Sequence, residues 1–201
     1  MPSLSSSLSS SVSSQSINIH HTKILLKSFI LLYSNDYLMN VVITPTEYRL
    51  SQVYFTEKKP NTHIANSTFN RITYSTNDFI MNGVYIQFEL FVKQNEQNFN
   101  SNIYNLHFDP EHEHNSKMIT IFNDIEDRIL DKWVRLEHPN DEIYQHQCKI
   151  KDIYQQLQSG IISVWKNEMR LYDKPQFQHF IIKISGIWDN ERGRGLTFKF
   201  I

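Results

Sequence analysis

The last 25 residues of the chain, numbers 177 to 201, contain the residue types that bind single-stranded nucleic acid. Aromatic rings stack on unpaired bases, each stacked base contributing roughly 1–3 kcal/mol, while cations contact the phosphates. The aromatic candidates are Trp188 and Phe198, and the cationic candidates are Lys183, Arg192, Arg194 and Lys199. This composition makes the C-terminal stretch the first candidate for a binding surface.

Each candidate also has an interpretation that needs no ligand. Trp188 and Phe198 lie at alternate positions among other apolar residues, so both would equally well be core side chains of a buried face. Arg192 and Arg194 lie in a glycine-rich connector, where charged side chains are commonly only solvated. Spacing alone leaves both interpretations open.

A β-hairpin is the local structure that would position these residues. Ile182 and Ile184 alternate before Gly186, and Leu196, Phe198 and Phe200 alternate on the return. A period of two is typical of half-buried strands. The connector from 189 to 195 contains Asn and Gly, which tolerate positive φ. We therefore predict two strands joined by a glycine-rich turn.

A weaker metal candidate precedes the longest helical pattern. His112 and His114 form an H-x-H pair flanked by carboxylates, and these ligand types suit zinc, iron or manganese. On an extended segment both imidazoles would share a face. The alternative is an exposed loop with incidental histidines. We assign no metal and no other cofactor to the chain from its sequence.

Signatures of catalysis are absent from the sequence. It contains no G-x-S-x-G elbow, no Walker loop and no H-E-x-x-H motif. The one cysteine, Cys148, permits neither an internal disulfide nor a thiolate cage, which favours a reducing intracellular compartment. No segment has the length and apolar character of a membrane span, so we expect no membrane partner.

The rest of the chain is predicted to be mostly strands. Residues 1–16 are serine-rich and predicted to be a disordered tail, followed by a single domain over 17–201. Strands are expected at 17–33, 37–43, 48–55, 69–74, 79–92, 103–108 and 161–166. Helices are expected at 118–133, from apolar residues three and four apart, and at 150–158, with Gly160 as the C-cap. This order predicts a β-rich α+β fold, either an OB-like barrel or an antiparallel sheet with one or two packed helices.

Charge is unevenly distributed although the net charge is only −1. Residues 109–144 hold ten acids and four bases, and residues 161–201 hold seven bases and four acids. No global basic field marks a nucleic-acid-binding protein. A solvated acidic helix beside a mildly basic sheet explains the same pattern.

Several short motifs resemble small proteins of large DNA viruses and virus-like elements. The motifs are KISGIWDN from Lys183 with GLTFKFI from Gly195, together with FNRITYS from Phe69 and NGVYI from Asn82. Those proteins resemble single-stranded-DNA-binding proteins with an OB-like barrel. The resemblance implies a barrel that binds displaced single strands during replication or recombination, through Lys183, Trp188, Arg192, Arg194, Phe198 and Lys199. Such proteins often end in an acidic tail, whereas here an acidic regulatory element would have to be the helix at 118–133.

Three functions of different classes are thus expected. The first is non-enzymatic binding of single-stranded DNA, in the host nucleus or cytoplasm or in a virion, by a monomer or a homo-oligomer. The second is a viral structural or assembly protein with no nucleic-acid role. The third is a metal-dependent enzyme that uses His112 and His114.

Overall fold

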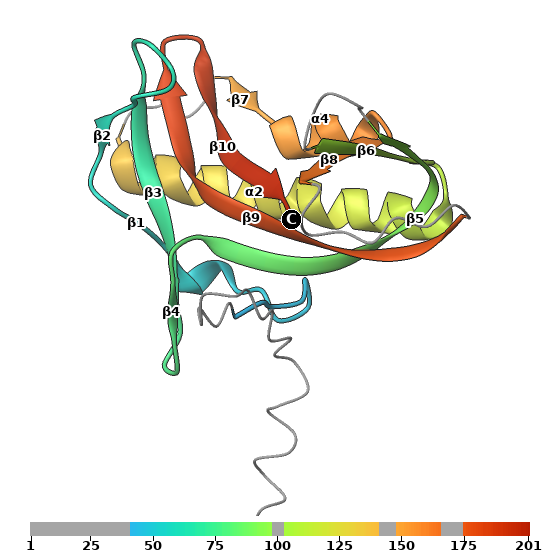
Figure 1. Cartoon of the computed structure of the whole chain (residues 1–201). Helices are drawn as coiled ribbons and strands as arrows, with labels where there is room; N and C mark the ends of the chain where they lie inside the picture. The colour runs from blue at the N-terminus through green and yellow to red at the C-terminus, as the bar shows by residue number, and fades with distance from the viewer. Residues whose placement is uncertain (1–40, 98–102, 141–147, 166–174) are drawn as a thin grey trace, which may run out of the picture.

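Five strands close into a β-barrel (Figure 1). The structure is a computed structural model and describes residues 41–97, 103–140, 148–165 and 175–201. Around the ring the strands are β5 (Val84–Gln97), β6 (Ile103–Phe108), β8 (Ile161–Trp165), β10 (Gly193–Phe200) and β9 (Gln176–Asn190), and β9 pairs again with β5. The β8–β10 pair is parallel and the other four pairs are antiparallel. The prediction of a β-rich, OB-like α+β fold is confirmed.

Aromatic rings fill the centre of the barrel. Phe88 of β5 lies 5.8 Å from Phe180 of β9 and 6.0 Å from Phe200 of β10, measured between ring centroids. The ring of Phe122 meets Phe88 edge-on at 4.8 Å. Edge-on and tilted pairs of this kind add stabilisation beyond their buried area. The core therefore joins barrel strands to a helix.

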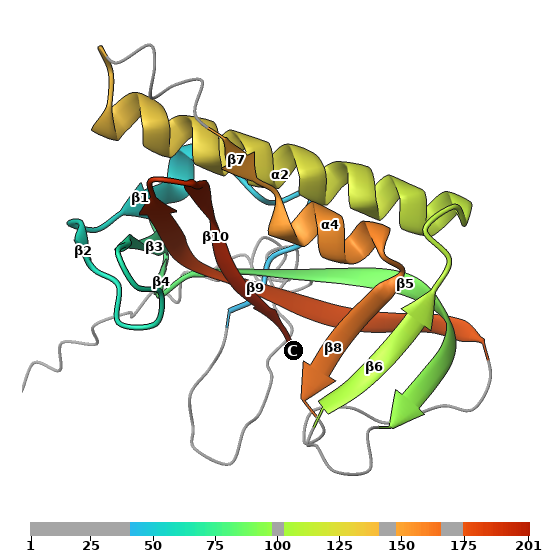
Figure 2. The ribbon, with the colours of Figure 1, turned by 90° about the horizontal axis from the view of Figure 1, so that it is seen from above.

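That helix is α2 (Glu113–Glu137), which runs along one side of the barrel beside the short α4 (Asp152–Gln158), as Figure 2 shows. The predicted amphipathic pattern holds, and the helix extends several residues beyond both predicted ends. Its buried apolar stripe consists of Ile119, Phe122, Ile125, Ile129, Leu130, Trp133 and Val134. Gly160 follows α4 with a φ of 72°, which confirms its predicted place at the helix C-terminus.

A buried carboxylate of α2 caps α4. The N–H groups of Ile153 and Tyr154 donate to Glu126 Oε1 and Oε2 at 3.1 and 3.0 Å. These are two of the donors that the first turn of a helix leaves without an internal partner. Glu126 is fully buried, and its burial raises the pKa of its carboxyl to about 7, an effect that the two donors only partly offset.

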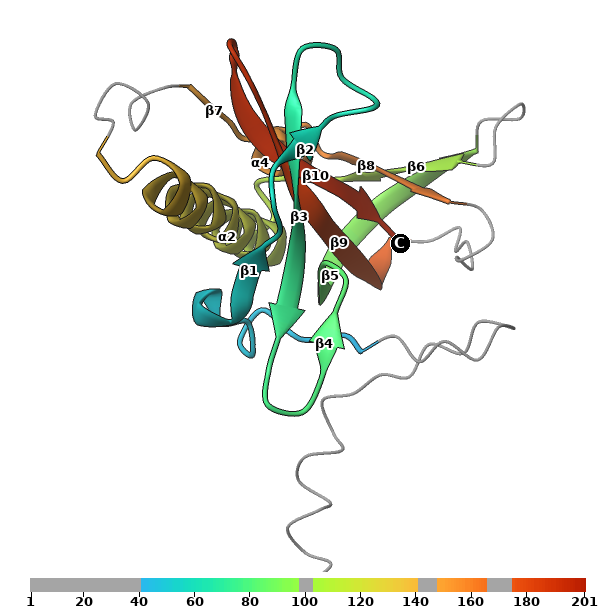
Figure 3. The same cartoon turned by 90° about the vertical axis from the view of Figure 1, so that its left-hand side faces the viewer.

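Strands from the first part of the described chain extend the sheet. They are β1 (Val53–Phe55), β2 (Lys59–Pro60), β3 (Thr68–Ser75) and β4 (Ile80–Met81). Figure 3 shows β3 beside β9, and the other three strands pair with β3. β3 pairs with the second half of β9, outside the closed ring. The strand predicted at 48–55 is wrong in its first half, because Leu50–Gln52 form a 3₁₀ turn. The predicted tail at 1–16, the strand at 17–33 and residues 37–40 lie outside the described residues.

Candidate nucleic-acid interface on the outer face of β9

The two long C-terminal strands form the predicted hairpin, and β3 and β5 flank it. Directly opposed residues of antiparallel strands project from the same face of a sheet. Ile184 and Ile187 of β9 are both fully buried on the barrel side, because a β-bulge shifts the register with β10 between them. On either side of this bulge, Lys183, Gly186 and Trp188 project outward. Three outward cross-strand rows result: Phe69–Trp188–Gly195, Arg71–Gly186–Thr197 and Tyr85–Lys183–Lys199.

We define the outer face of β9 as six residues of these rows. They are Phe69, Arg71, Tyr85, Lys183, Trp188 and Lys199. Arg71 and Lys199 are exposed, and the other four are partly exposed. The three rows contain no carboxylate. The outer face therefore presents three aromatic rings and three cations to solvent.

Two glycines allow aromatic rings to lie close against this sheet. A Cβ at Gly195 would be 2.8 Å from Cζ2 and 2.9 Å from Cε2 of Trp188, so the indole covers this backbone. A Cβ at Gly186 would clash with the ring of Phe69 and would lie 2.6 Å from the carbonyl oxygen of Asn70. Both rings thus lie close over glycine positions of the sheet, and both remain partly exposed. Base stacking requires an accessible aromatic ring of this kind.

The cations of this region have no acidic partners nearby. Lys183 Nζ lies 5.0 Å from the ring centroid of Tyr85, a cation–π distance. Lys59 is exposed and lies opposite Phe69 at the edge of the face. Within the described ranges, neither these two lysines nor Arg71 and Lys199 form an ion pair. Their charge is therefore available to phosphates.

The hairpin turn presents a further cation. Arg192 is exposed in the turn between β9 and β10, as predicted, and its N–H donates to Asn190 Oδ1 at 2.9 Å. Among the described residues it forms no ion pair. Arg192 is thus placed to extend the positive charge of the outer face.

Two of the predicted site residues lie on the other side of the sheet. Arg194 has no exposed surface, and its guanidinium carbon lies 5.9 Å from the ring of Trp133. The expectation that Arg194 reaches phosphates from a solvated turn is wrong, because β10 already begins at Gly193. Phe198 packs against the core, opposite Ile184 and 5.6 Å from Phe200. Phe198 is partly exposed but lies on the opposite side of the sheet from Trp188, so it does not belong to the outer face of β9.

Burial predicts that substitution of Arg194 lowers stability far more than substitution of Arg192. Arg194→Ala removes a large buried side chain and its contact with Trp133, and we expect it to lower the free energy of unfolding by about 2 kcal/mol or more. Arg192→Ala is expected to change it by less than about 0.5 kcal/mol, as at other exposed positions. Urea denaturation measures both. Equal losses in the two variants would contradict this placement.

The predicted metal pair is not assembled. The two imidazoles would share a face only on an extended segment, but α2 begins at Glu113, directly after His112. The ring of His112 stacks on Phe91 at 4.7 Å, while His114 Nε2 lies 3.1 Å from the carbonyl oxygen of Glu89. The described part of the chain contains no group of three or more His, Cys, Asp or Glu residues that could hold a metal ion. The two histidines have structural contacts instead.

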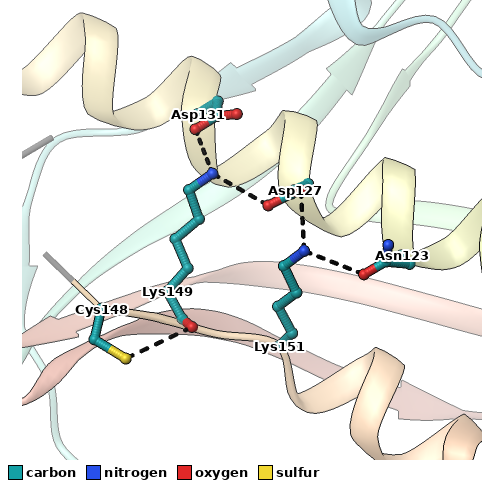
Figure 4. Close-up of polar contacts among 6 residues, drawn as sticks. All are labelled: Asn123, Asp127, Asp131, Cys148, Lys149 and Lys151. Carbon is teal, nitrogen blue, oxygen red and sulfur yellow. Dashed lines mark hydrogen bonds and ion pairs between the residues drawn. The ribbon is translucent and has the colours of Figure 1, made fainter. Parts of the chain in front are cut away.

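The acidic face of α2 is partly neutralised by the segment that precedes α4. Lys149, in the short strand β7 (Lys149–Ile150), contacts Asp131 at 2.6 Å and Asp127 at 3.1 Å (Figure 4). Lys151 contacts Asp127 at 2.9 Å. Partial burial alone would raise the pKa of Asp127, but hydrogen bonds from both lysines outweigh it and hold this pKa below its usual value. These carboxylates therefore fasten β7 to the helix, which leaves less charge for a regulatory role.

No family model, curated protein or solved structure matches the chain. In the described residues, no helix has the length and apolar character needed to cross a membrane. Sequence reasoning found Lys183, Trp188, Arg192 and Lys199 but missed Phe69, Arg71 and Tyr85, because these become neighbours only through strand pairing.

Proposed function

We propose that the protein binds single-stranded DNA without acting as an enzyme, and that the outer face of β9 is the binding surface. One observation carries the proposal. The cross-strand rows place Trp188, Phe69 and Tyr85 beside Arg71, Lys183 and Lys199 on one surface of an OB-like barrel. Aromatic platforms with adjacent cations are the usual means of holding a single strand. OB-fold barrels commonly bind oligonucleotides or oligosaccharides.

Single strands fit this surface better than duplexes do. In a duplex the bases are already stacked on one another, and only their edges are presented to a protein. A ring that lies against a sheet needs the π-face of an unpaired base. Cations alone would bind both forms, so the aromatic residues provide the preference.

The setting of the proposed activity follows from the resemblance of the terminal hairpin. It would be replication or recombination of a DNA virus or virus-like element, where displaced strands need protection. A reducing intracellular compartment agrees with the exposed thiol of Cys148. No feature of the described residues favours the assembly-protein alternative over this one.

Fluorescence anisotropy with a labelled oligo-dT at two or more salt concentrations tests the proposal. We expect the single strand to bind more tightly than a duplex of equal length. If four cations contact phosphates, log K should fall with log[salt] with a slope of about −3, since each contact contributes about 0.7. No binding at low salt would refute the proposal, and self-association seen by light scattering would then favour an assembly role.

A further inference from the structure

A second aromatic cluster lies at the other end of β9. Phe177 is 49% exposed and meets Phe91 of β5 edge-on at 5.2 Å. The ring of His112 stacks on Phe91 with an interplanar angle of only 12°, and His114 lies 5.1 Å from Phe177. We call Phe91, His112, His114 and Phe177 the distal cluster. About half of the surface of Phe177 is thus open to solvent, and its ring is in contact with other aromatic rings.

The distal cluster belongs to the same side of the sheet as the outer face of β9. Phe177, His179 and Lys183 alternate with the buried Gln178, Phe180 and Ile182, while Ile181, which projects to the same side as the first three, is itself buried. Strand register pairs Phe177 with Phe91, just as it pairs Lys183 with Tyr85. At about 3.3 Å per residue, Phe177 and Trp188 are separated by roughly 35 Å along the strand. One side of β9 therefore carries both aromatic groups, with the buried Ile181 between them.

A carboxylate interrupts this surface and is flanked by imidazoles. Glu89 lies opposite His179, and its Oε1 is 3.4 Å from His179 Nε2. Its Oε2 lies 3.8 Å from His114 Nε2. Either imidazole offsets the carboxylate charge when it carries a proton. The carboxylate of Glu89 would still repel a phosphate of a strand bound along β9. Removing this charge by substitution therefore tests whether the strand passes Glu89.

We infer that the distal cluster is a second stacking platform for the same single strand, so that the bound strand follows β9 from Trp188 to Phe177. This inference rests on the proposed function. Its ligand is an unpaired base, which stacks on the exposed ring of Phe177. A long oligonucleotide would reach both platforms, whereas a short one would occupy only the Trp188 end, where the cations are concentrated.

Oligonucleotide length separates this inference from the proposed function. OB folds occupy about 4 to about 16 nucleotides, so oligo-dT of these two lengths serves as the probe. We expect Phe177→Ala to weaken binding of the long oligonucleotide by about 5-fold or more and to change binding of the short one by less than about 2-fold. Glu89→Gln is expected to strengthen binding of the long oligonucleotide by about 2- to 3-fold, because it removes a negative charge.

Leu136→Ala is the matched control, because Leu136 is an apolar side chain of α2 that is 61% exposed. It should leave both affinities unchanged. Tight binding of the long oligonucleotide that neither Phe177→Ala nor Glu89→Gln alters would overturn the second platform while leaving the proposed function intact. Failure of the unmodified protein to bind either length would refute both.

Discussion

Replacing Trp188 with alanine is expected to weaken oligo-dT binding by between about 5-fold and about 150-fold. This range corresponds to the roughly 1–3 kcal/mol that one stacked base loses when its aromatic platform is removed. Trp188 is the larger of the two rings that lie across glycines, and it forms the centre of its cross-strand row. Fluorescence anisotropy at one fixed salt concentration gives the affinity ratio directly.

Trp188→Phe is the matched control, because it keeps a stacking ring and should recover most of the affinity. A second variant separates the aromatic contribution from the cationic one. Lys183→Ala with Lys199→Ala should make the salt slope shallower by about 1.4, at about 0.7 for each lost phosphate contact, whereas Trp188→Ala should leave the slope unchanged. Unaltered affinity in Trp188→Ala, with its thermal unfolding transition preserved, would remove Trp188 from the interface.

The sequence predicted the barrel hairpin, because its two strands carry alternating apolar residues and are adjacent in the chain. The three outward rows could not be predicted in the same way. Phe69 lies more than a hundred residues before its partner Trp188. Periodicity indicates which residues of a strand share a face, but it does not say which other strand pairs with it. Only strand pairing, between β3 and β9 for Arg71 and between β5 and β9 for Tyr85, placed these residues on the outer face of β9.

The errors at the hairpin come from the length assigned to its turn. Glycines at 193 and 195 made a seven-residue connector plausible, but in the structure the turn is only Glu191–Arg192. Gly193 keeps a φ of 150° at the start of β10, and Gly195 accommodates the ring of Trp188. With β10 starting so early, Arg194 occupies an inward position and becomes buried. The glycines at 193 and 195 therefore indicate close packing in the hairpin and not a long connecting loop.

The first turn of α2 was also beyond what the sequence could predict. The apolar spacing of the helix correctly predicted residues 118–133, but its first turn contains Glu113 and His114, which add nothing to an apolar pattern. Asn115, also in this first turn, accepts a hydrogen bond from the N–H of Phe91 and donates one to its carbonyl oxygen through the side-chain amide. A tertiary contact of this kind leaves no signal in local sequence.

Glu126→Ala is expected to lower the free energy of unfolding by about 3 kcal/mol. The substitution leaves the N–H groups of Ile153 and Tyr154 without their acceptor, and each unsatisfied buried donor costs about 1–3 kcal/mol. It also opens a cavity between α2 and α4. Urea denaturation measures the loss, and Glu137→Ala is a suitable control because Glu137 is exposed on the same helix. Equal stability of these two variants would rule out the capping role.

Stability should also depend on pH through this group. Burial raises the pKa of Glu126 from 4.5 to about 7, so between these values the folded protein binds more protons than the unfolded chain does. The free energy of unfolding therefore falls as the pH rises through this window, and the contribution that is lost amounts to at most about 3 kcal/mol.

The Glu126→Gln variant cannot titrate at this position, so the comparison isolates the contribution of Glu126. We expect the stability of the unmodified protein to decline relative to this variant between about pH 4.5 and pH 7, with no further relative change above pH 8. Parallel stability curves for the two proteins would contradict a buried, titrating Glu126. Because Glu126 lies between the two helices, this substitution should leave oligo-dT affinity unchanged wherever both proteins are folded.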